Sequence, residues 1–273
     1  MSLPGTLLAV LDWRSWAVLS RNLRVFLRNF RTAMVPPAME PLIFFGAFGL
    51  GLGGYVGSLD YEGGSVPYAT WVAPGMLAFG AFATPFYDAL YGAYVRMFYQ
   101  KTWDGILATQ VELPHLLWGE VLWGGARSVL NLSIVCVVIS GLDLAGFVDL
   151  HLATMPLVLV LGFVGGCVFA AFGLVFVALV PAIDHMNYPV FLVGTPLSLV
   201  SNTYFPADQA SPRLAAFLEA NPLYHLAESF RTLLVLGRPT YHLAAFLGEA
   251  LVILVVCYLF ALRFTRRRMF EAQ

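Results

Sequence analysis

The sequence predicts an all-α protein that crosses a membrane several times, and three observations lead to that prediction. The chain of 273 residues is 59% hydrophobic and only 11% charged, whereas a soluble domain carries about 25% charged residues. Its mean hydropathy is +0.77. Apolar runs long enough to span a bilayer recur along the chain, and bilayer helices bury such runs without a water-facing shell. We therefore expect a single membrane domain over residues 1–273.

Charge and motif content exclude several classes of function. The net charge of −1 gives no electrostatic reason to expect a nucleic-acid partner. The one lysine, Lys101, has no glycine-rich phosphate loop before it, and neither a zinc-protease motif nor a serine-hydrolase motif occurs. The three cysteines lie in apolar runs without metal-ligand spacing. We expect no catalytic residue, no metal site and no cofactor bound by this chain.

The first predicted element is an amphipathic helix at residues 13–31. Five arginines in this stretch alternate with apolar side chains at helical spacing. Such a helix lies in the membrane interface, with its arginines toward headgroups and water. No apolar signal sequence precedes it, so we expect the protein to insert by its own transmembrane helices.

Six apolar segments are then expected to span the membrane. The first contains several prolines and a run of glycines, which permit close approach of a neighbouring helix, and a polar loop with Asp60 and Glu62 follows it. Between the last two spans, residues 206–239 form short amphipathic pieces, none long enough to cross. The predicted spans cover about residues 34–55, 68–95, 115–140, 152–180, 188–205 and 241–262.

Six spans place both termini on the same side of the membrane. The basic residues lie mostly on that side: in the N-terminal helix, in the segment after the second span and in the tail from Arg263 to Arg268. Because cytoplasmic loops carry an excess of lysine and arginine, we expect both termini in the cytoplasm.

The segment between the second and third spans is the most informative part of the chain. Residues 97–110 are amphipathic, and too short and polar to cross a membrane. Their place on the arginine-rich side suits a helix that docks on a cytoplasmic partner. An ordinary interfacial loop helix would have the same composition, and the residues alone leave both interpretations open.

Five ionisable residues fall inside the predicted spans, where charge is costly unless it faces a cavity or another charge. Glu120 and Arg127 lie seven residues apart, two helical turns on one face, and could line one polar stripe. A translocation path would explain such a stripe, and so would a structural ion pair. The others are Glu40, Asp88 and Glu249, of which Glu40 and Glu249 could lie at the interface.

With these motifs in place, the chain resembles the ABC-2 type permeases, and among them the NodJ-like exporters of lipo-oligosaccharides and polysaccharides. The resemblance covers about residues 20–265. Its most specific part runs from Arg96-Met97 through Gln100-Lys101-Thr102-Trp103-Asp104-Gly105 to Gly119-Glu120. Further matches are Pro41-Leu42-Ile43-Phe44, Ala73-Pro74-Gly75-Met76, Tyr204-Phe205-Pro206 and Asn221-Pro222-Leu223-Tyr224-His225 with Arg231.

The resemblance implies a half-transporter of six helices with the type V, ABCG-like exporter fold, in a bacterial inner membrane. It would form a homodimer on two copies of a separate NodI-like ABC ATPase, which binds the ATP and magnesium. Residues 13–31 would be its connecting helix, 97–110 its coupling helix, and 206–239 the re-entrant helices of the outer face. The implied substrate is amphiphilic: a lipo-oligosaccharide, a glycolipid or a hydrophobic drug-like molecule.

The resemblance also implies roles for particular residues. Contacts with the ATPase are expected from Gln100, Lys101, Thr102, Trp103, Asp104 and Gly105, together with Arg24 and Arg28. In the family, the first, second and fifth spans line the translocation path. The candidates for that path here are Glu40, Asp88, Glu120, Arg127, Tyr204 and Phe205.

Two other functions compete with this one. An ion-coupled secondary transporter usually has two inverted halves and ion carriers within the membrane, but no internal symmetry is evident, and Glu40, Asp88 and Glu249 are expected to be isolated. A membrane acyl- or glycosyl-transferase would need a His/Asp or paired-carboxylate cluster at one membrane face, which the sequence does not assemble.

Overall fold

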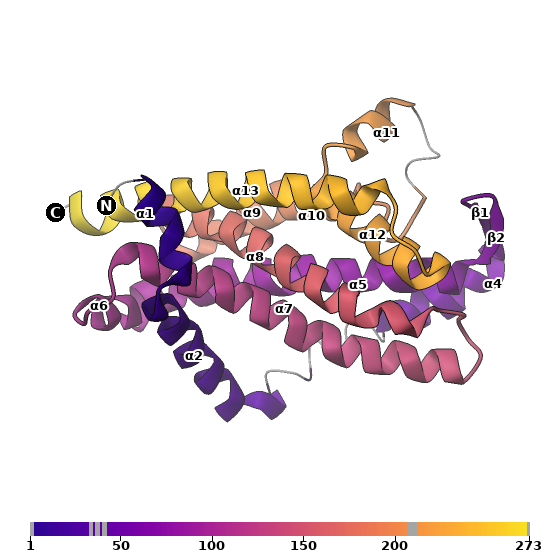
Figure 1. Ribbon diagram of the computed structural model, residues 1–273, viewed down its shortest axis with the longest axis horizontal. Helices are drawn as coiled ribbons and strands as arrows, with labels where there is room; N and C mark the ends of the chain where they lie inside the picture. Colours follow the sequence, from indigo (N-terminus) through magenta and orange to yellow (C-terminus); the bar gives the residue numbers. More distant parts are fainter. Residues whose placement is uncertain (1–2, 33–34, 36–38, 40–42, 207–211, 272–273) are drawn as a thin grey trace.

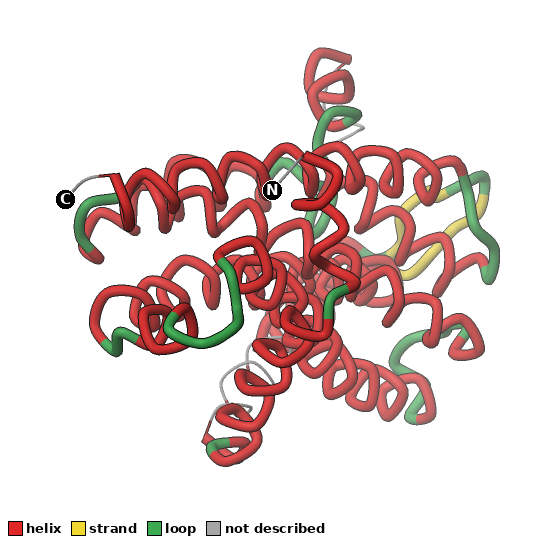
Figure 2. The backbone as a smooth tube through the Cα atoms, turned by 60° about the vertical axis from the view of Figure 1, so that its left-hand side comes forward, coloured by secondary structure: helices red, strands yellow, loops and turns green. Residues whose placement is uncertain are grey.

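The computed structural model describes residues 3–32, 35, 39, 43–206 and 212–271. Figure 1 shows an elongated bundle in which the longest helices run along the long axis. Both termini and helix α6 lie at one end, and a two-stranded hairpin lies at the other. We call these the α6 end and the hairpin end. Figure 2 shows that the described chain is helical almost throughout, apart from that hairpin and the loops.

Three of the described helices are long and apolar enough, by length and composition, to cross a membrane. They coincide with the predicted third, fourth and sixth spans. α8 packs against both α7 and α13, so it is the most buried of the three. Their bounds are Leu113–Leu144 for α7, Met155–Leu179 for α8, which the turn η5 (Leu152–Thr154) precedes, and Tyr241–Arg266 for α13, which continues into η9 (Arg267–Glu271).

The predicted second span is part of a longer helix. α5 (Tyr68–Tyr87) continues into two π-helical stretches, η3 (Asp88–Ala93) and η4 (Val95–Tyr99). Most α5 side chains are buried, against α7, α8 and α12. π-Helical turns are uncommon and frequently mark functional sites. Asp88 and Arg96, whose contacts matter below, lie in these two stretches.

The described part of the predicted first span is short. It comprises the π-helix η2 (Phe45–Leu52) and α4 (Gly53–Val56). A polar loop is expected next, but the chain instead forms an antiparallel hairpin of β1 (Ser58–Tyr61) and β2 (Gly64–Pro67). Its turn residues, Glu62 and Gly63, have positive φ angles of 49° and 79°. A two-residue turn of this mirror-image type matches the twist of the strands that it joins.

The predicted fifth span ends before residue 205. The turn η6 (Ile183–Met186) precedes it, and its helical residues lie in α9 (Asn187–Pro189), η7 (Val190–Gly194) and α10 (Thr195–Leu199). Beyond Leu199 the chain leaves the helix, and Asn202 has a φ of 57°. A left-handed residue cannot continue a right-handed helix, so the prediction of a helix through residue 205 is wrong.

The segment predicted to cap the outer face contains two helices of different character. α11 (Pro212–Leu218) protrudes from the bundle in Figure 1. α12 (Pro222–Leu236) is instead buried over most of its length, against α5 and α13. The Asn221 side chain caps α12 by accepting a hydrogen bond from the Leu223 amide at 3.0 Å, and Gly237 ends the helix with a φ of 68°. α12 is therefore an element of the core.

Small residues bring α7 close to α8. A Cβ atom added to Gly124 would lie 2.2 Å from the Cβ of Ala170, and one added to Gly166 would lie 2.6 Å from the Cβ of Ser128. Close backbone approach of this kind holds helices together in membranes. By contrast, a Cβ atom at Gly54, in the predicted first span, would meet nothing within 4 Å.

The N-terminal amphipathic helix forms α2 (Trp13–Arg28), which follows α1 (Leu3–Leu8) and the turn η1 (Ala9–Leu11). α2 buries Ser15, Val18, Asn22 and Phe26, which recur every three or four residues on one face. It crosses α7 where Gly119 leaves room, since a Cβ atom there would lie 2.4 Å from the Cβ of Val18. Figure 1 shows α2 leaving the bundle at an angle.

Arg268, which follows α13, forms hydrogen bonds with the C-terminal end of α8. The Arg268 guanidinium, in η9, donates hydrogen bonds to the main-chain carbonyls of Val177 (3.0 Å), Val180 (2.6 Å) and Pro181 (3.2 Å). Its Cζ also lies 4.3 Å from the centre of the Phe98 ring. The last carbonyls of a helix have no partner within that helix, so one side chain supplies donors at this helix end.

Candidate functional site

Helix α6 (Thr102–Leu107) is shorter than the coupling helix expected over residues 97–110. Lys101 has a φ of 52°, and this left-handed residue separates α6 from the end of η4 at Tyr99. A left-handed residue cannot lie inside a right-handed helix, which is why the stretch divides in two. The prediction of one continuous helix is therefore wrong, although a helix does lie at its centre.

Trp103 fixes α6 to the bundle. Its side chain is 0% exposed, and its indole Nε1 donates a hydrogen bond to Oε1 of Glu120 on α7, at 3.2 Å. The rest of α6 is more open: Asp104 and Gly105 are exposed, and Lys101 and Asp104 form a surface ion pair at 3.8 Å. α6 is therefore a helix with one buried anchor and one exposed face.

Glu120 and Asp88 hold Arg96 between them. Arg96 donates from Nε and Nη2 to the two oxygens of Glu120, at 3.1 and 2.6 Å, in the paired geometry that makes such bonds strong. The same Nη2 lies 3.4 Å from Oδ2 of Asp88. Glu120 is only 4% exposed, and a buried carboxylate needs such a partner. Asp88 is therefore not isolated, contrary to expectation, and Glu120 pairs with Arg96 instead of Arg127.

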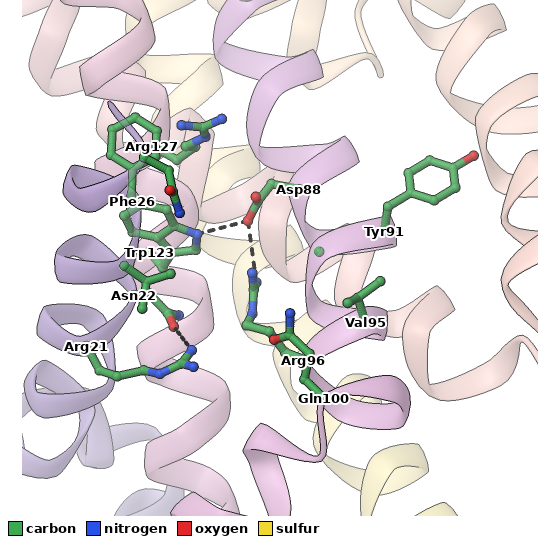
Figure 3. A pocket seen from close by; sticks show the side chains of 13 residues that line it. Arg21, Asn22, Phe26, Asp88, Tyr91, Val95, Arg96, Gln100, Trp123 and Arg127 are labelled. Carbon is green, nitrogen blue, oxygen red and sulfur yellow. Dashed lines mark hydrogen bonds and ion pairs between the residues drawn. The ribbon is translucent and has the colours of Figure 1, made fainter. Parts of the chain in front are cut away.

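Trp123 adds a second indole to this group. Its Nε1 donates to Oδ2 of Asp88 at 2.9 Å, and Figure 3 shows the two contacts that converge on Asp88. Contacts therefore continue from Trp103 to Glu120 and Arg96, and on to Asp88 and Trp123. We call these five residues the α6 network. The α6 network joins α6 and α7 to η3 and η4.

A cavity of about 430 Å³ lies beside the α6 network, between α2, α7 and the π-helical stretches. Figure 3 shows Arg127 next to Phe26 at one side of it, with the guanidinium Cζ 4.3 Å from the ring centre. Arg21 donates from Nη1 to Oδ1 of Asn22 at 2.8 Å. Burial lowers the pKa of Arg21 from its ordinary value, and the charge of Glu120 opposes that effect. Because the ordinary pKa of arginine is so high, the group stays protonated at neutral pH.

The remaining residues predicted to contact an ATPase are surface residues around this site. Arg24 and Arg28 are exposed on α2, Thr102 is half-buried at the start of α6, and Gln100 is exposed and lines the cavity. Of the predicted path residues, Asp88 and Arg127 also line the cavity. The structure thus brings residues from two separately predicted sets to one cavity.

Tyr204 and Phe205 belong to an aromatic group elsewhere. The centre of the Tyr204 ring lies 5.7 Å from that of Phe44 and 5.4 Å from that of Phe48, and Phe205 meets Phe48 edge-on at 6.0 Å. These two path candidates therefore lie with the predicted first span and outside the α6 network. Another candidate, Glu40, lies outside the described residues.

A second buried polar cluster joins the hairpin to α12, and it was not among the predicted sites. Arg231 is fully buried; it donates to the carbonyls of Trp71 (3.0 Å) and Asn202 (2.6 Å) and pairs with Glu228. Glu228 also accepts from the amide of Asn202 and the hydroxyl of Tyr61, at 2.8 and 2.9 Å. Burial and the charge of Glu228 raise the pKa of Tyr61. Two features of the sequence are signals for this cluster: Arg231 is among the residues that match the family, and Glu228 and Arg231 are three residues apart on one helix.

A third group of ionisable residues surrounds His225 of α12. Its Nδ1 lies 3.0 Å from Nδ1 of His242, and its Nε2 lies 3.6 Å from Oε2 of Glu219 and 3.7 Å from Oε1 of Glu249. Glu249 is therefore not isolated either. Within the part of the chain that the structure describes, no three such side chains are grouped so that they could hold a metal ion.

The sequence is similar to a known family and to named proteins. A family model described as ABC-2 type transporter matches residues 14–235. Nodulation protein J of Rhizobium leguminosarum bv. trifolii is 29% identical over 268 residues, which are 98% of this chain and 97% of that protein. Nodulation protein J of Rhizobium leguminosarum bv. viciae is 30% identical over 262 residues, 95% of each chain. The protein of the same name from Rhizobium meliloti is 28% identical over 257 residues, 94% of each chain.

Proposed function

The chain belongs to the ABC-2 type transporter family, and from this premise we propose that it is the membrane subunit of an ATP-driven exporter. The family resemblance described from the sequence is thereby confirmed. In this proposal, two copies of the chain assemble with two copies of a separate, NodI-like ABC ATPase, which binds and hydrolyses the ATP. The substrate is amphiphilic: a lipo-oligosaccharide, a glycolipid or a hydrophobic drug-like molecule.

The observation that carries this proposal is the α6 network. An ATPase that moves on nucleotide binding pushes against the exposed face of α6, and the buried Trp103 passes that movement to Glu120 on α7. Arg96, in η4, binds Glu120, and Asp88, in η3, binds Arg96 in turn. Packed interfaces change between discrete arrangements, so a small displacement of α6 shifts these helices relative to each other.

The distribution of basic residues supports attachment of the ATPase at the α6 end. α2 with its arginines and the arginine-rich tail lie near that end, together with both described chain ends. By the excess of basic residues in cytoplasmic segments, the α6 end faces the cytoplasm of a bacterium. We infer six spans in the bacterial inner membrane. Three are α7, α8 and α13, and the other three are α5, the helical stretch that ends at Leu199, and the predicted first span, about residues 34–55.

An ion-coupled secondary transporter is a second candidate, and the group around His225 is the observation that favours it. His225 has His242 and the carboxylates of Glu219 and Glu249 within 3.0–3.7 Å. Ionisable residues in membrane helices that face one another can carry protons. This function would need no ATPase.

Co-purification followed by transport assays separates the two functions. If the chain is an exporter subunit, an ABC ATPase purifies with it in equal amount, and a suitable amphiphile stimulates ATP hydrolysis in the complex. If the chain purifies alone, and liposomes that contain only this chain move substrate in response to a proton gradient, the exporter proposal is wrong.

Asp104→Lys tests the coupling step itself. It places a second cation beside Lys101 on the exposed face of α6 and leaves the buried Trp103 unchanged. Substrate stimulation of ATP hydrolysis should be lost while the complex keeps its melting temperature. Arg213→Glu, a charge reversal at another exposed position, on α11, is the matched control and should keep stimulation. Normal stimulation in the Asp104→Lys complex would contradict the role of α6.

A further inference from the structure

The cavity beside the α6 network is bordered by hydrogen-bond donors that have no partner. Nε and Nη1 of Arg127 and Nδ2 of Asn22 are buried and form no hydrogen bond, and both residues line the cavity. Asn22 is only 4% exposed, and Arg21 already occupies its Oδ1, so its amide can act here only as a donor. Buried polar groups in proteins are nearly always paired. These donors indicate that the cavity accepts a ligand rich in hydrogen-bond acceptors.

The charges around the cavity favour an anionic ligand. Arg21, Arg96 and Arg127 line it, and Asp88 is the only carboxylate among its lining residues. Arg96 is already held by Glu120 and Asp88. The positive charges of Arg21, from α2, and Arg127, from α7, therefore face the cavity from two different helices.

Phe26 holds Arg127 in place for such a ligand. The guanidinium Cζ lies 4.3 Å from the centre of the Phe26 ring, and Figure 3 shows the two side chains together at the wall of the cavity. A guanidinium that stacks on a ring keeps its in-plane N–H groups for hydrogen bonds. Donors held in advance lose less entropy when they bind.

We propose that this cavity binds the phosphate of an anionic membrane lipid. Arginine forks match the oxygens of a phosphate group, and the apolar side chains of Val25, Phe26 and Val95 line the same cavity and suit the start of the acyl chains. Val25 and Asn29, which also line it, are exposed, so the cavity opens to the outside of the chain.

The position of the cavity favours a lipid over a soluble phosphate. One of its walls is α2, which has arginines on its surface and exposed Trp13, Trp16 and Leu27 beside them. Such a helix lies at the level of the lipid headgroups. A lipid held by Asn22 on α2 and Arg127 on α7 ties these helices together next to Asp88 and Trp123. The site exists whether or not the chain exports anything.

Native mass spectrometry of the detergent-purified full chain tests the proposal. The protein is titrated with phosphatidylglycerol and phosphatidylcholine of equal chain length, in competition. Wild-type protein should retain one phosphatidylglycerol in preference to phosphatidylcholine. Arg127→Gln removes a charged donor and should weaken that retention at least about tenfold. Arg213→Gln makes the same charge change at an exposed position of α11 outside the cavity, and should retain the lipid as wild type does.

Two further measurements keep the test decisive. Asn22→Ala removes the uncharged amide donor and should also weaken lipid retention. If Arg127→Gln fails to fold, Asn22→Ala alone tests whether the cavity binds the lipid. Inorganic phosphate should displace the lipid only weakly. Equal retention of both lipids, or wild-type retention in Asn22→Ala and Arg127→Gln, would overturn the site. Full displacement by millimolar phosphate would overturn its assignment to a lipid.

Discussion

The indole of Trp103 and the carboxylate of Glu120 are joined by a single hydrogen bond of 3.2 Å, and it links α6 to α7. Trp103 contributes both a buried ring and this donor, and Glu120 keeps Arg96 as a second partner. Substitutions of Trp103 can therefore remove the hydrogen bond alone or the hydrogen bond together with the ring, and we expect these two changes to lower stability by different amounts.

Trp103→Phe should cost about 1 kcal/mol of unfolding free energy, because it keeps a ring and loses one hydrogen bond. Trp103→Ala should cost about 3–5 kcal/mol, because it also opens a cavity. Denaturant unfolding in detergent measures both. Trp16→Phe, on the 49% exposed Trp16 of α2, is the matched control and should change little. Equal stability of both Trp103 variants and the wild type would mean that α6 is not anchored through this residue.

Arg96→Met should destabilise the protein by about 3–5 kcal/mol, because it leaves the buried carboxylate of Glu120 and the half-buried carboxylate of Asp88 without their cation. Adding Glu120→Gln to that variant should restore part of the loss, because the uncompensated charge disappears. A double-mutant cycle measures this coupling, which we expect to be about 0.5–3 kcal/mol. Strictly additive costs would show that the pair does not interact in the folded protein.

Gly124→Leu should separate α7 from α8, since a Cβ atom at this position already lies 2.2 Å from the Cβ of Ala170. Overpacking of this kind costs about 1–3 kcal/mol or more. Gly141→Leu, on the same helix but with nothing within 4 Å of a Cβ atom, is the control. The melting temperature should fall for the first variant only, and an equal fall in both would point to helix propensity instead of packing.

Asp12 should make stability depend on pH at the start of α2. The main-chain amide of Arg14 donates to its carboxylate at 3.0 Å, and this bond, with the nearby charge of Arg14, lowers the pKa of Asp12. A lowered pKa adds stability above the ordinary value of about 4, and that stability is lost as the pH falls through the folded-state pKa.

The melting temperatures of the wild type and Asp12→Asn should therefore differ near neutral pH and converge below about pH 4. Asp12→Asn keeps an N-capping side chain, so the comparison isolates the charge. Asp60→Asn, at an exposed position in the hairpin, serves as the control. A constant difference between wild type and Asp12→Asn at all pH values would show that the charge of Asp12 is not involved.

The sequence predicted those features that depend on local composition. A run of about twenty apolar residues defines a span by itself, so α7, α8 and α13 could be found within a few residues of their bounds. The amphipathic spacing of α2 could be found in the same way. One local feature could not be predicted, which is that Lys101 divides the expected coupling helix. Lysine has no preference for the left-handed region, so nothing in the sequence indicated this break.

The contacts that define the buried clusters could not be predicted, because they join distant parts of the chain. Tyr61 and Glu228 are 167 residues apart in sequence, and Trp118 donates to the carbonyl of Thr6 across 112 residues. One sequence shows which side chains need partners and does not show which partners they have. This is why Asp88 and Glu249 were expected to be isolated, and why the role of Arg231 was missed.

The hydrogen bonds from Arg268 to the end of α8 have a consequence for the order in which the protein is made. Val177 is synthesised 91 residues before Arg268, and chains are made from the N-terminus. While the ribosome is still producing α13, these carbonyls lack the guanidinium that will bind them, and the last carbonyls of a helix have no partner within that helix. We therefore expect the last turn of α8 to gain these hydrogen bonds only after α13 has been made. A chain that stops before Arg268 should lack these hydrogen bonds, and we expect the last turn of α8 to fray more easily in it.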